Sequence, residues 1–374
     1  MFRAIYFRTA SELITSPKLR RVRRSFWSGW RGLSSRDPVV RYFHDDDDPY
    51  SQLTAGVLPA LQRRYRIRLD AYSVPPPQLS AAPDIERLQR WSRYDAVRLA
   101  MKYGLAPARL PAGAPDGSRL RQRLGHYLGA TFHFEGEWYW GIDRLHYLER
   151  RLIDSGLATS ESTPMFPPPE LQWRAPSAGH SRPTLHFFCS LRSPYTWLAA
   201  ERVRRLAEHY GAELRLRFVL PMVMRGLPVP FAKRLYILRD TKREAERLAL
   251  PFGCIVDPVG SATERGLAVL HRAIDIGRGP DFLASFLRGV FAEGIDATTT
   301  PGLLTIAARA GLSAGDVKAG LAHDDWREVA EANRAELLAC GLWGVPSFRV
   351  DDRPAVWGQD RLWMIEQDLI DTVC

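Results

Sequence analysis

At 374 residues the chain is longer than one ordinary domain, and its composition, 45% hydrophobic and 25% charged, excludes a chain that is disordered throughout. No apolar run reaches the roughly 18 to 20 residues of a membrane-spanning helix, and no signal-peptide pattern is present, so we expect a cytoplasmic protein without a membrane partner. The formal net charge of +10 suits an anionic small molecule, but outside the N-terminal segment the basic excess is too mild to favour nucleic acid.

Residues 1–36 form a basic N-terminal segment. It contains one acidic residue, Glu12. Its basic residues are Arg3, Arg8, Lys18, Arg20, Arg21, Arg23, Arg24, Arg31 and Arg36. Such a segment can be a solvated helix, an anion-attracting arm or an assembly element, and we favour a solvated or packing role.

Residues 37–160 have the pattern of a small α/β domain. In chain order we predict a strand at 39–44, a helix from Asp48 to about Arg64, a strand at 66–74, and a hairpin at 132–140 followed by a helix. The region between the second strand and the hairpin is short and Pro-rich at its start, so we expect any helical lid that it forms to be smaller than the corresponding region of the second half.

Residues 161–182 are rich in proline and serine, which predicts a semi-rigid linker between two domains. Residues 183–374 then repeat the plan of the first half. The predicted elements are a strand at 184–189, a helix from Ser193 to about Tyr210, a strand at 213–219, a helical insert at about 225–338, and a final hairpin and helix.

The two hairpins share a sequence motif, Trp-Gly-x-Asp-Arg-Leu, which begins at Trp140 and again at Trp357. A repeated motif at equivalent places indicates two related domains. The order of strand, helix, strand, hairpin and helix resembles that of thioredoxin. We therefore predict an α/β fold of tandem thioredoxin-like domains, the second with a large helical insert.

Ser193 and Pro194 follow a strand and start a helix, where serine is a preferred N-cap and proline suits the first helical position. The same place has a chemical use, because a helix N-terminus stabilises an anion. A hydroxyl there could donate a hydrogen bond to a thiolate and lower its pKa by roughly one to two units. A cis bond at Pro346 would likewise turn the backbone of Val345 toward a peptide-like ligand.

Three segments together resemble the DsbA-like family, in the branch of 2-hydroxychromene-2-carboxylate isomerases and kappa-class glutathione transferases. They are 187–199, 343–348 and 357–362, and the resemblance covers about 184–369. It implies glutathione as the cofactor, with Ser193 contacting its sulfur and with Val345 and Pro346 holding the cysteinyl part. It also implies that Gln359 and Asp360 hold the γ-glutamyl end.

The residues that we expect to contact a substrate rest on weaker arguments. They are Arg192, Tyr195, Arg225, Lys233 and Tyr236. We interpret the charged residues of 243–247, including Glu244 and Arg247, as a solvated helix face.

The first half is expected to be inactive. Asp48 stands at the serine position, Ala130 replaces the proline, and the carboxylates of 45–48 disfavour an anion there. We expect no metal site, and metal binding by these aspartates is a lesser alternative because a hard cation needs further oxygen ligands.

The leading hypothesis is a glutathione-dependent isomerase or transferase that acts on an aromatic or conjugated electrophilic small molecule. One alternative is a non-catalytic tandem thioredoxin-like binding or scaffold protein. A thiol-disulfide oxidoreductase is disfavoured because Ser193 and Thr196 occupy both positions of a CxxC motif. The chain could form a homodimer, or its first half could imitate a second subunit.

Overall fold

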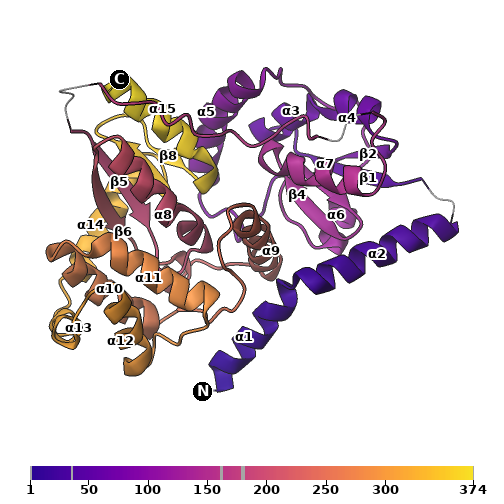
Figure 1. The fold of residues 1–374 in the computed structure, drawn as a ribbon. Coiled ribbons are helices and arrows are strands. Elements are labelled where there is room, and N and C mark those ends of the chain that lie inside the picture. The colour runs from indigo at the N-terminus through magenta and orange to yellow at the C-terminus, as the bar shows by residue number, and fades with distance from the viewer. Residues whose placement is uncertain (1, 35–36, 161–162, 178–181, 374) are drawn as a thin grey trace. The chain divides into compact units, whose positions relative to one another are not determined.

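The computed structural model describes residues 2–34, 37–160, 163–177 and 182–373 (Figure 1). The chain divides into two compact units. Unit 1 comprises Met1–Ser16, Glu170–Pro228 and Ile237–Cys374. Unit 2 comprises Pro17–Pro169 and Val229–Tyr236.

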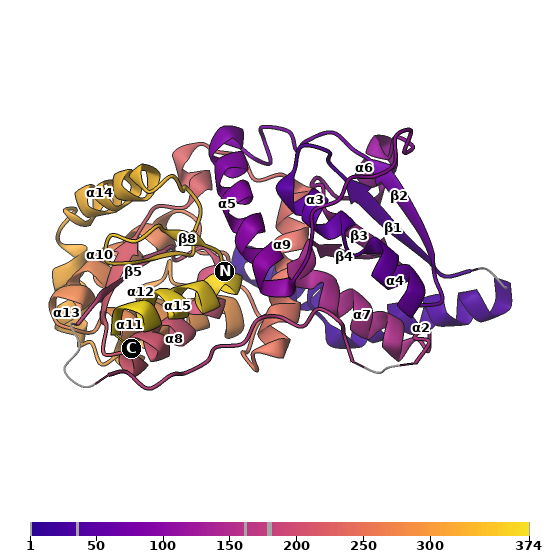
Figure 2. The same ribbon diagram turned by 90° about the horizontal axis from the view of Figure 1, so that it is seen from above.

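Unit 2 contains a four-stranded sheet with the order β2-β1-β3-β4. The strands are β1 (Val39–His44), β2 (Arg68–Ser73), β3 (Thr131–Phe134) and β4 (Glu137–Trp140). β1 pairs parallel with β2 and antiparallel with β3, and β3 forms a hairpin with β4. The helices are α3 (Pro49–Ala55), α4 (Leu58–Arg64), α5 (Ile85–Tyr103), α6 (Ser118–Leu124), the 3₁₀ turn η1 (Ile142–Arg144) and α7 (Leu145–Asp154). Within this unit α3 and α5 lie side by side (Figure 2).

Unit 1 contains a second four-stranded sheet, with the order β6-β5-β7-β8. The strands are β5 (Thr184–Cys189), β6 (Glu213–Phe218), β7 (Ser347–Val350) and β8 (Val356–Trp357). β5 pairs parallel with β6 and antiparallel with β7, and β7 pairs antiparallel with β8. Helix α8 (Pro194–His209) connects the parallel strands, and the 3₁₀ turn η3 (Gln359–Arg361) leads into α15 (Leu362–Val373).

The two sheets have the same strand order and the same strand directions. In each sheet a helical segment connects the parallel pair and a hairpin joins the last antiparallel pair, as the geometry of these pairings requires. Their cores also correspond. Phe132 of β3 and Phe348 of β7 are both fully buried, and each lies opposite an aromatic residue of the central strand, Tyr42 or Phe187. The predicted fold of tandem thioredoxin-like domains is therefore confirmed.

The region expected to be a helical insert contains one 3₁₀ turn and a series of α-helices. They are η2 (Met222–Arg225), α9 (Phe231–Arg247), α10 (Ser261–Asp275), α11 (Gly279–Ala292), α12 (Thr300–Arg309), α13 (Ala314–Leu321) and α14 (Trp326–Ala339). α11 packs against α8, and α10 packs against α11 and α13. The first residues of α9, up to Tyr236, belong to unit 2.

The Pro-rich segment between the sheets is held by a buried glutamate in each unit. In unit 2, Glu149 of α7 accepts hydrogen bonds from the backbone of Met165 and Phe166, at 2.8 and 3.1 Å. In unit 1, Glu366 of α15 accepts hydrogen bonds from the backbone of Gln172 and Trp173, at 2.6 and 2.7 Å. The described part of the expected linker is thus attached to both units.

Each of these glutamates also accepts a hydrogen bond from a buried tyrosine. The hydroxyl of Tyr65 donates to Glu149 at 3.0 Å, and the hydroxyl of Tyr210 donates to Glu366 at 3.1 Å. A buried carboxylate is costly unless several donors satisfy it, so the repeated arrangement indicates a structural role for both pairs.

The basic N-terminal segment forms two helices, α1 (Phe2–Ile14) and α2 (Pro17–Ser34), that belong to different units. The hydroxyl of Ser11 in α1 donates to the Gly253 carbonyl at 2.8 Å and accepts from the Ile255 amide at 3.1 Å, both in unit 1. Helix α2 packs with unit 2. Among the described residues, no helix combines the length and the apolar character that crossing a membrane requires.

Candidate functional site

Ser193 is the N-cap of α8. The strand β5 ends at Cys189, and the amide of Ser193 then donates to the Ser190 carbonyl at 3.1 Å, which forms a turn. The Ser193 side chain accepts a hydrogen bond from the Thr196 amide at 3.2 Å, and Pro194 occupies the first helical turn. The hydroxyl therefore lies at the positive end of the helix dipole, where an anion is stabilised.

The bond between Val345 and Pro346 is cis and lies against this helix start. The Ser193 hydroxyl donates to the Val345 carbonyl at 3.4 Å, and the Pro346 carbonyl accepts from the Gly358 amide at 2.9 Å. The structure thus brings Ser193, Val345 and Pro346 together. Val345 is half-buried, with its carbonyl directed at the hydroxyl that is expected to meet a sulfur.

Gly344 allows this loop to approach the β8 hairpin closely. A Cβ atom added at Gly344 would lie 2.1 Å from the ring of Trp357, which is much shorter than any van der Waals contact. Trp357 also packs against Trp343, with ring centroids 4.7 Å apart. The sequence around the cis proline is therefore constrained by packing as well as by any ligand.

Gln359 and Asp360 follow the hairpin, and the Gln359 side chain is engaged by other protein groups. Its amide nitrogen donates to Glu244 at 3.0 Å and also to Asp360, while its amide oxygen accepts from Arg202 at 2.7 Å. Gln359 is 1% exposed, whereas Asp360 is half-buried. The structure brings the two residues together, but Gln359 contributes to an internal charge network.

That network lies between α8 and α9. Burial lowers the pKa of Arg202 to about 10, and the charge of Arg247 lowers it as well, whereas Asp360 and Glu244 raise it. Glu244 is fully buried and accepts a hydrogen bond from Arg247 at 2.7 Å. The interpretation of this part of α9 as a solvated face is therefore wrong for Glu244, because the charged side chains pair with groups of unit 1.

Arg192 and Tyr195 are placed beside Ser193 in the sequence but make contacts of their own. The guanidinium of Arg192 forms a bidentate ion pair with Asp257, with both distances 2.7 Å. The hydroxyl of Tyr195 donates to Asp240 at 2.8 Å. Both partners belong to the inserted region, so these two residues attach the start of α8 to the insert.

The remaining expected substrate contacts lie elsewhere. Arg225 ends η2, and burial lowers the pKa of its guanidinium. Lys233 and Tyr236 belong to unit 2, where the Lys233 ammonium donates to the Ala81 carbonyl at 2.7 Å and Tyr236 packs with Phe43 and its neighbours. Unit 1 by itself does not bring either residue to Ser193.

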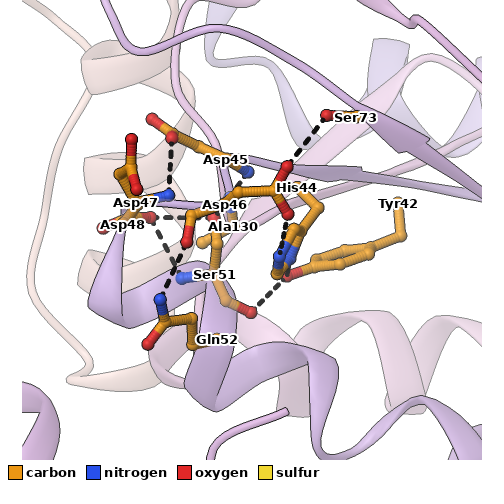
Figure 3. Close-up of polar contacts among 10 residues, drawn as sticks. All are labelled: Tyr42, His44, Asp45, Asp46, Asp47, Asp48, Ser51, Gln52, Ser73 and Ala130. Carbon is orange, nitrogen blue, oxygen red and sulfur yellow. Dashed lines mark hydrogen bonds and ion pairs between the residues drawn. The ribbon is translucent and has the colours of Figure 1, made fainter. Parts of the chain in front are cut away.

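In the first half, Asp48 occupies the place that Ser193 has in the second. Its carboxylate lies at the start of α3, beside Ser51 (Figure 3). It accepts hydrogen bonds from the amides of Tyr50 and Ser51 and from the Ser51 hydroxyl, at 3.2, 3.0 and 2.9 Å. Burial raises the pKa of Asp48 to about 6, and the charge of Asp45 also raises it, while the hydrogen bonds from Ser51 lower it.

The neighbouring aspartates also contact residues close to them in the sequence (Figure 3). Asp45 accepts from the Asp47 amide at 3.2 Å, and Asp46 pairs with the buried ring of His44 at 3.2 Å. Ala130 stands at the place of the cis proline with φ of 52°, and its amide donates to the Ser51 hydroxyl at 2.7 Å. Over the described residues, no group of His, Cys, Asp and Glu side chains is arranged to hold a metal ion.

Two cavities of the described residues are lined by residues other than Ser193. One, of about 790 Å³ in unit 2, is lined by α3, α5 and the loop that follows α5, with Asp47 and Arg93 among its polar residues. The other, of about 290 Å³ in unit 1, is lined by the end of α14 and the β7–β8 turn, including Arg349 and Cys340. Neither has Ser193 among its lining residues.

Sequence reasoning missed Arg202 and Glu244 as partners of Gln359. Arg202 lies within a charged stretch of α8, and Glu244 has an arginine three residues later, a spacing that is also typical of exposed helices. Only the tertiary packing of α8 against α9 distinguishes them. The equivalent tyrosine–aspartate contacts in the two units, Tyr50 with Asp95 and Tyr195 with Asp240, were also not predicted.

No curated protein matches the chain. Solved structures that are similar to it include a 2-hydroxychromene-2-carboxylate isomerase, at 20% identity over 50% of this chain and 94% of that one, with a TM-score of 0.42. A probable DsbA oxidoreductase from Streptomyces coelicolor is 22% identical over 51% and 90%, with a TM-score of 0.41. The cytosolic disulfide reductase DsbM from Pseudomonas aeruginosa is 22% identical over 50% and 95%, with a TM-score of 0.40.

A family model provides the stronger result. The model of the DSBA-like thioredoxin domain matches residues 184–370, which span the sheet of unit 1, the helical insert and α15. The matched range also includes the capped helix start at Ser193 and the cis bond before Pro346. The chain therefore belongs to the DSBA-like thioredoxin domain family.

Proposed function

We propose that this protein is a glutathione-dependent isomerase or transferase that acts on an aromatic or conjugated electrophilic small molecule. The observation that supports this proposal is the position of the Ser193 hydroxyl, at the N-terminus of α8 and 3.4 Å from the Val345 carbonyl. Glutathione, when bound, would supply a nucleophilic thiolate for addition to the substrate.

The residues present fit the sulfur and the cysteinyl part of glutathione. The Ser193 hydroxyl is half-buried, and its proton now points toward a carbonyl. Rotation of that proton toward a bound sulfur would replace a long hydrogen bond with a charge-assisted one, which is about twice as strong. The positive end of the α8 dipole would stabilise the same negative charge.

The fit at the γ-glutamyl end depends on Asp360. The Gln359 amide is already bonded to Arg202 and Glu244, so it positions neighbouring groups instead of reaching outward. Asp360 is half-buried and its carboxylate could accept an ammonium group. We therefore assign recognition of the glutathione amino group to Asp360 and a positioning role to Gln359.

The experiment is a calorimetric titration of the full-length protein with glutathione. Ser193→Ala removes the hydroxyl, and we expect the affinity to fall roughly ten- to hundredfold, since a hydrogen bond to a charged group contributes roughly 1.5–3 kcal/mol. Ser313→Ala is the matched control, because Ser313 is the N-cap of α13 in the same unit and accepts from the Asp316 amide in the same way.

Glutathione binding that is weakened in Ser193→Ala and unchanged in Ser313→Ala would support the proposal. If both variants bind as the unchanged protein does, Ser193 is only a helix cap and the proposal is wrong. The control matters because losing a cap costs about 0.5–2 kcal/mol of stability by itself.

One observation favours a second candidate, a non-catalytic tandem thioredoxin-like scaffold. The Gln359 side chain has its donors and acceptor satisfied within the protein, which is the arrangement of a structural residue. Absence of glutathione binding at millimolar concentration would favour this candidate. Turnover in an insulin-reduction assay would favour a thiol-disulfide oxidoreductase over both.

A further inference from the structure

Helix α2 carries apolar side chains on the face that points away from its own unit. Five large apolar side chains are exposed along one side of this helix, and we call them the α2 stripe. They are Leu19, Val22, Phe26, Trp30 and Leu33. Phe26 is 63% exposed, Val22 is 66% exposed and Leu33 is 88% exposed. Their spacing of three and four residues places them on one face of a helix.

The opposite face of α2 is the one that attaches to unit 2, and it is polar. The guanidinium of Arg24 forms a bidentate ion pair with Glu137, at 2.6 and 2.7 Å. Arg31 pairs with Glu135, and both glutamates are largely buried at the β3–β4 hairpin. Trp27 lies between these two arginines on the same side, beside Gly136. The helix is therefore bound through arginines while its apolar face is directed outward.

This arrangement is the reverse of an ordinary surface helix, which packs its apolar stripe against the core and presents its charges to water. Exposed single apolar residues are common, but a continuous stripe along a whole helix marks an interaction surface. A partner that binds this surface must cover both the apolar side chains and the charged side chains beside them.

The charges beside the stripe are basic. Lys18 and Arg23 are exposed beside it, Arg21 is exposed farther round the helix, and the sequence of α2 contains no acidic residue. The glutamates nearest the helix, Glu135 and Glu137, are paired with arginines and are not directed at the stripe. An anionic surface is therefore attracted to the N-terminal half of α2, where these cations lie.

We propose that α2 is a membrane-surface helix that binds the face of an anionic phospholipid bilayer. A helix with Trp, Phe and Leu on one side and Lys or Arg beside them lies in the interface, with its apolar side chains among the acyl chains and its cations at the headgroups. Lys and Arg stems can extend along the apolar face while their charged ends stay at the phosphates. This proposal replaces the expectation of a protein without a membrane partner.

The test measures cosedimentation of the full-length protein with vesicles of phosphatidylcholine alone and of phosphatidylcholine mixed equally with phosphatidylglycerol. We expect binding to the anionic vesicles only. The double variant Phe26→Ser, Trp30→Ser should lower the vesicle partition coefficient at least about tenfold, which corresponds to about 1.4 kcal/mol. Lys18→Gln with Arg23→Gln should also weaken binding and reduce its salt dependence.

The matched control is the double variant Val97→Ser, Met101→Ser on α5 of the same unit, whose side chains are 60% and 79% exposed. It removes a similar exposed apolar area from a helix outside the α2 stripe, and it should leave vesicle binding within about twofold of the starting value. Circular dichroism checks that all variants keep their helical content.

Three results would overturn the proposal. The first is no cosedimentation with the anionic vesicles, and the second is equal binding by the stripe variant and the unchanged protein. The third is a dimer in light scattering that the Phe26→Ser, Trp30→Ser variant converts to a monomer without any vesicle binding. That result would assign the stripe to a second copy of the chain instead.

Discussion

Three residues are the most informative at the scale of single residues: Ser193, Asp48 and Gly344. Ser193 and Asp48 cap equivalent helices, but a hydroxyl can donate to a bound anion whereas a carboxylate repels one. Gly344 controls how closely the cis-proline loop approaches the hairpin. The sequence predicted the first contrast because capping residues and charges are local, but the role of Gly344 depends on a ring thirteen positions later.

The first residue-scale prediction concerns pH. In the folded protein the pKa of Asp48 is raised to about 6, against about 3.9 in an unfolded chain. Because the folded state holds the proton more tightly, the free energy of unfolding should fall as pH rises from about 4 to 6, by up to about 1.4 kcal/mol per pH unit. Urea unfolding across this range measures it.

Asp48→Asn is the matched variant, since asparagine also caps helices but does not titrate. Its stability should depend less on pH between 4 and 6 than that of the unchanged protein. Identical pH profiles for the two proteins would show that the carboxyl of Asp48 is not perturbed.

The second residue-scale prediction concerns Gly344→Ala. The added Cβ would meet the Trp357 ring, so the loop or the ring must shift, and we expect a loss of about 1–3 kcal/mol in the free energy of unfolding. Gly315→Ala in α13 is the control, because its nearest described atom is a side-chain oxygen 3.4 Å away. Thermal unfolding compares the two, and equal stability would contradict the packing argument.

At the scale of elements, the segment between the sheets is the clearest difference from expectation. Its proline content indicates a semi-rigid linker, yet the described residues 163–177 are hydrogen-bonded to Glu149 in one unit and Glu366 in the other. The order of strands and helices along the chain, the helix starts and the hairpins could be predicted from periodicity and turn residues. The attachment of the linker could not, because a buried glutamate in a helix has no distinctive sequence pattern.

Glu366→Gln tests this attachment. The amide nitrogen of glutamine would replace one of the two carboxylate oxygens and would face the backbone amide of either Gln172 or Trp173. One donor would then meet another donor, and we expect a loss of about 1.5–3 kcal/mol in stability. Limited proteolysis should then cleave residues 170–177 faster. Glu328→Gln, at an exposed position of α14, is the control and should change neither quantity.

At the scale of the whole molecule, two sheets of the same order are present in one chain. The repeated Trp-Gly-x-Asp-Arg-Leu motif predicted this duplication, and the shared tyrosine–glutamate pairs extend it to the cores. The opposite assignments of α1 and α2 to units 1 and 2 could not be predicted, because both helices belong to one uninterrupted basic segment.

A chain with an internal duplicate has a covalent substitute for a second subunit, so we predict a monomer in solution. Size-exclusion chromatography with light scattering should give a mass near 42.4 kDa in the absence of lipid. A mass twice as large at micromolar concentration would contradict the interpretation of the first half as an imitation of a partner.

The central claim, that the Ser193 hydroxyl stabilises a bound thiolate, is tested most directly by titrating that thiol. The ultraviolet absorbance of the thiolate can be followed with pH for glutathione bound to the protein, with S-methylglutathione as the blank. We predict a pKa about one to two units below the usual value of about 8.5, and a higher one in Ser193→Ala. A bound thiol that titrates as free glutathione does, or a titration that Ser193→Ala leaves unchanged, would contradict the account.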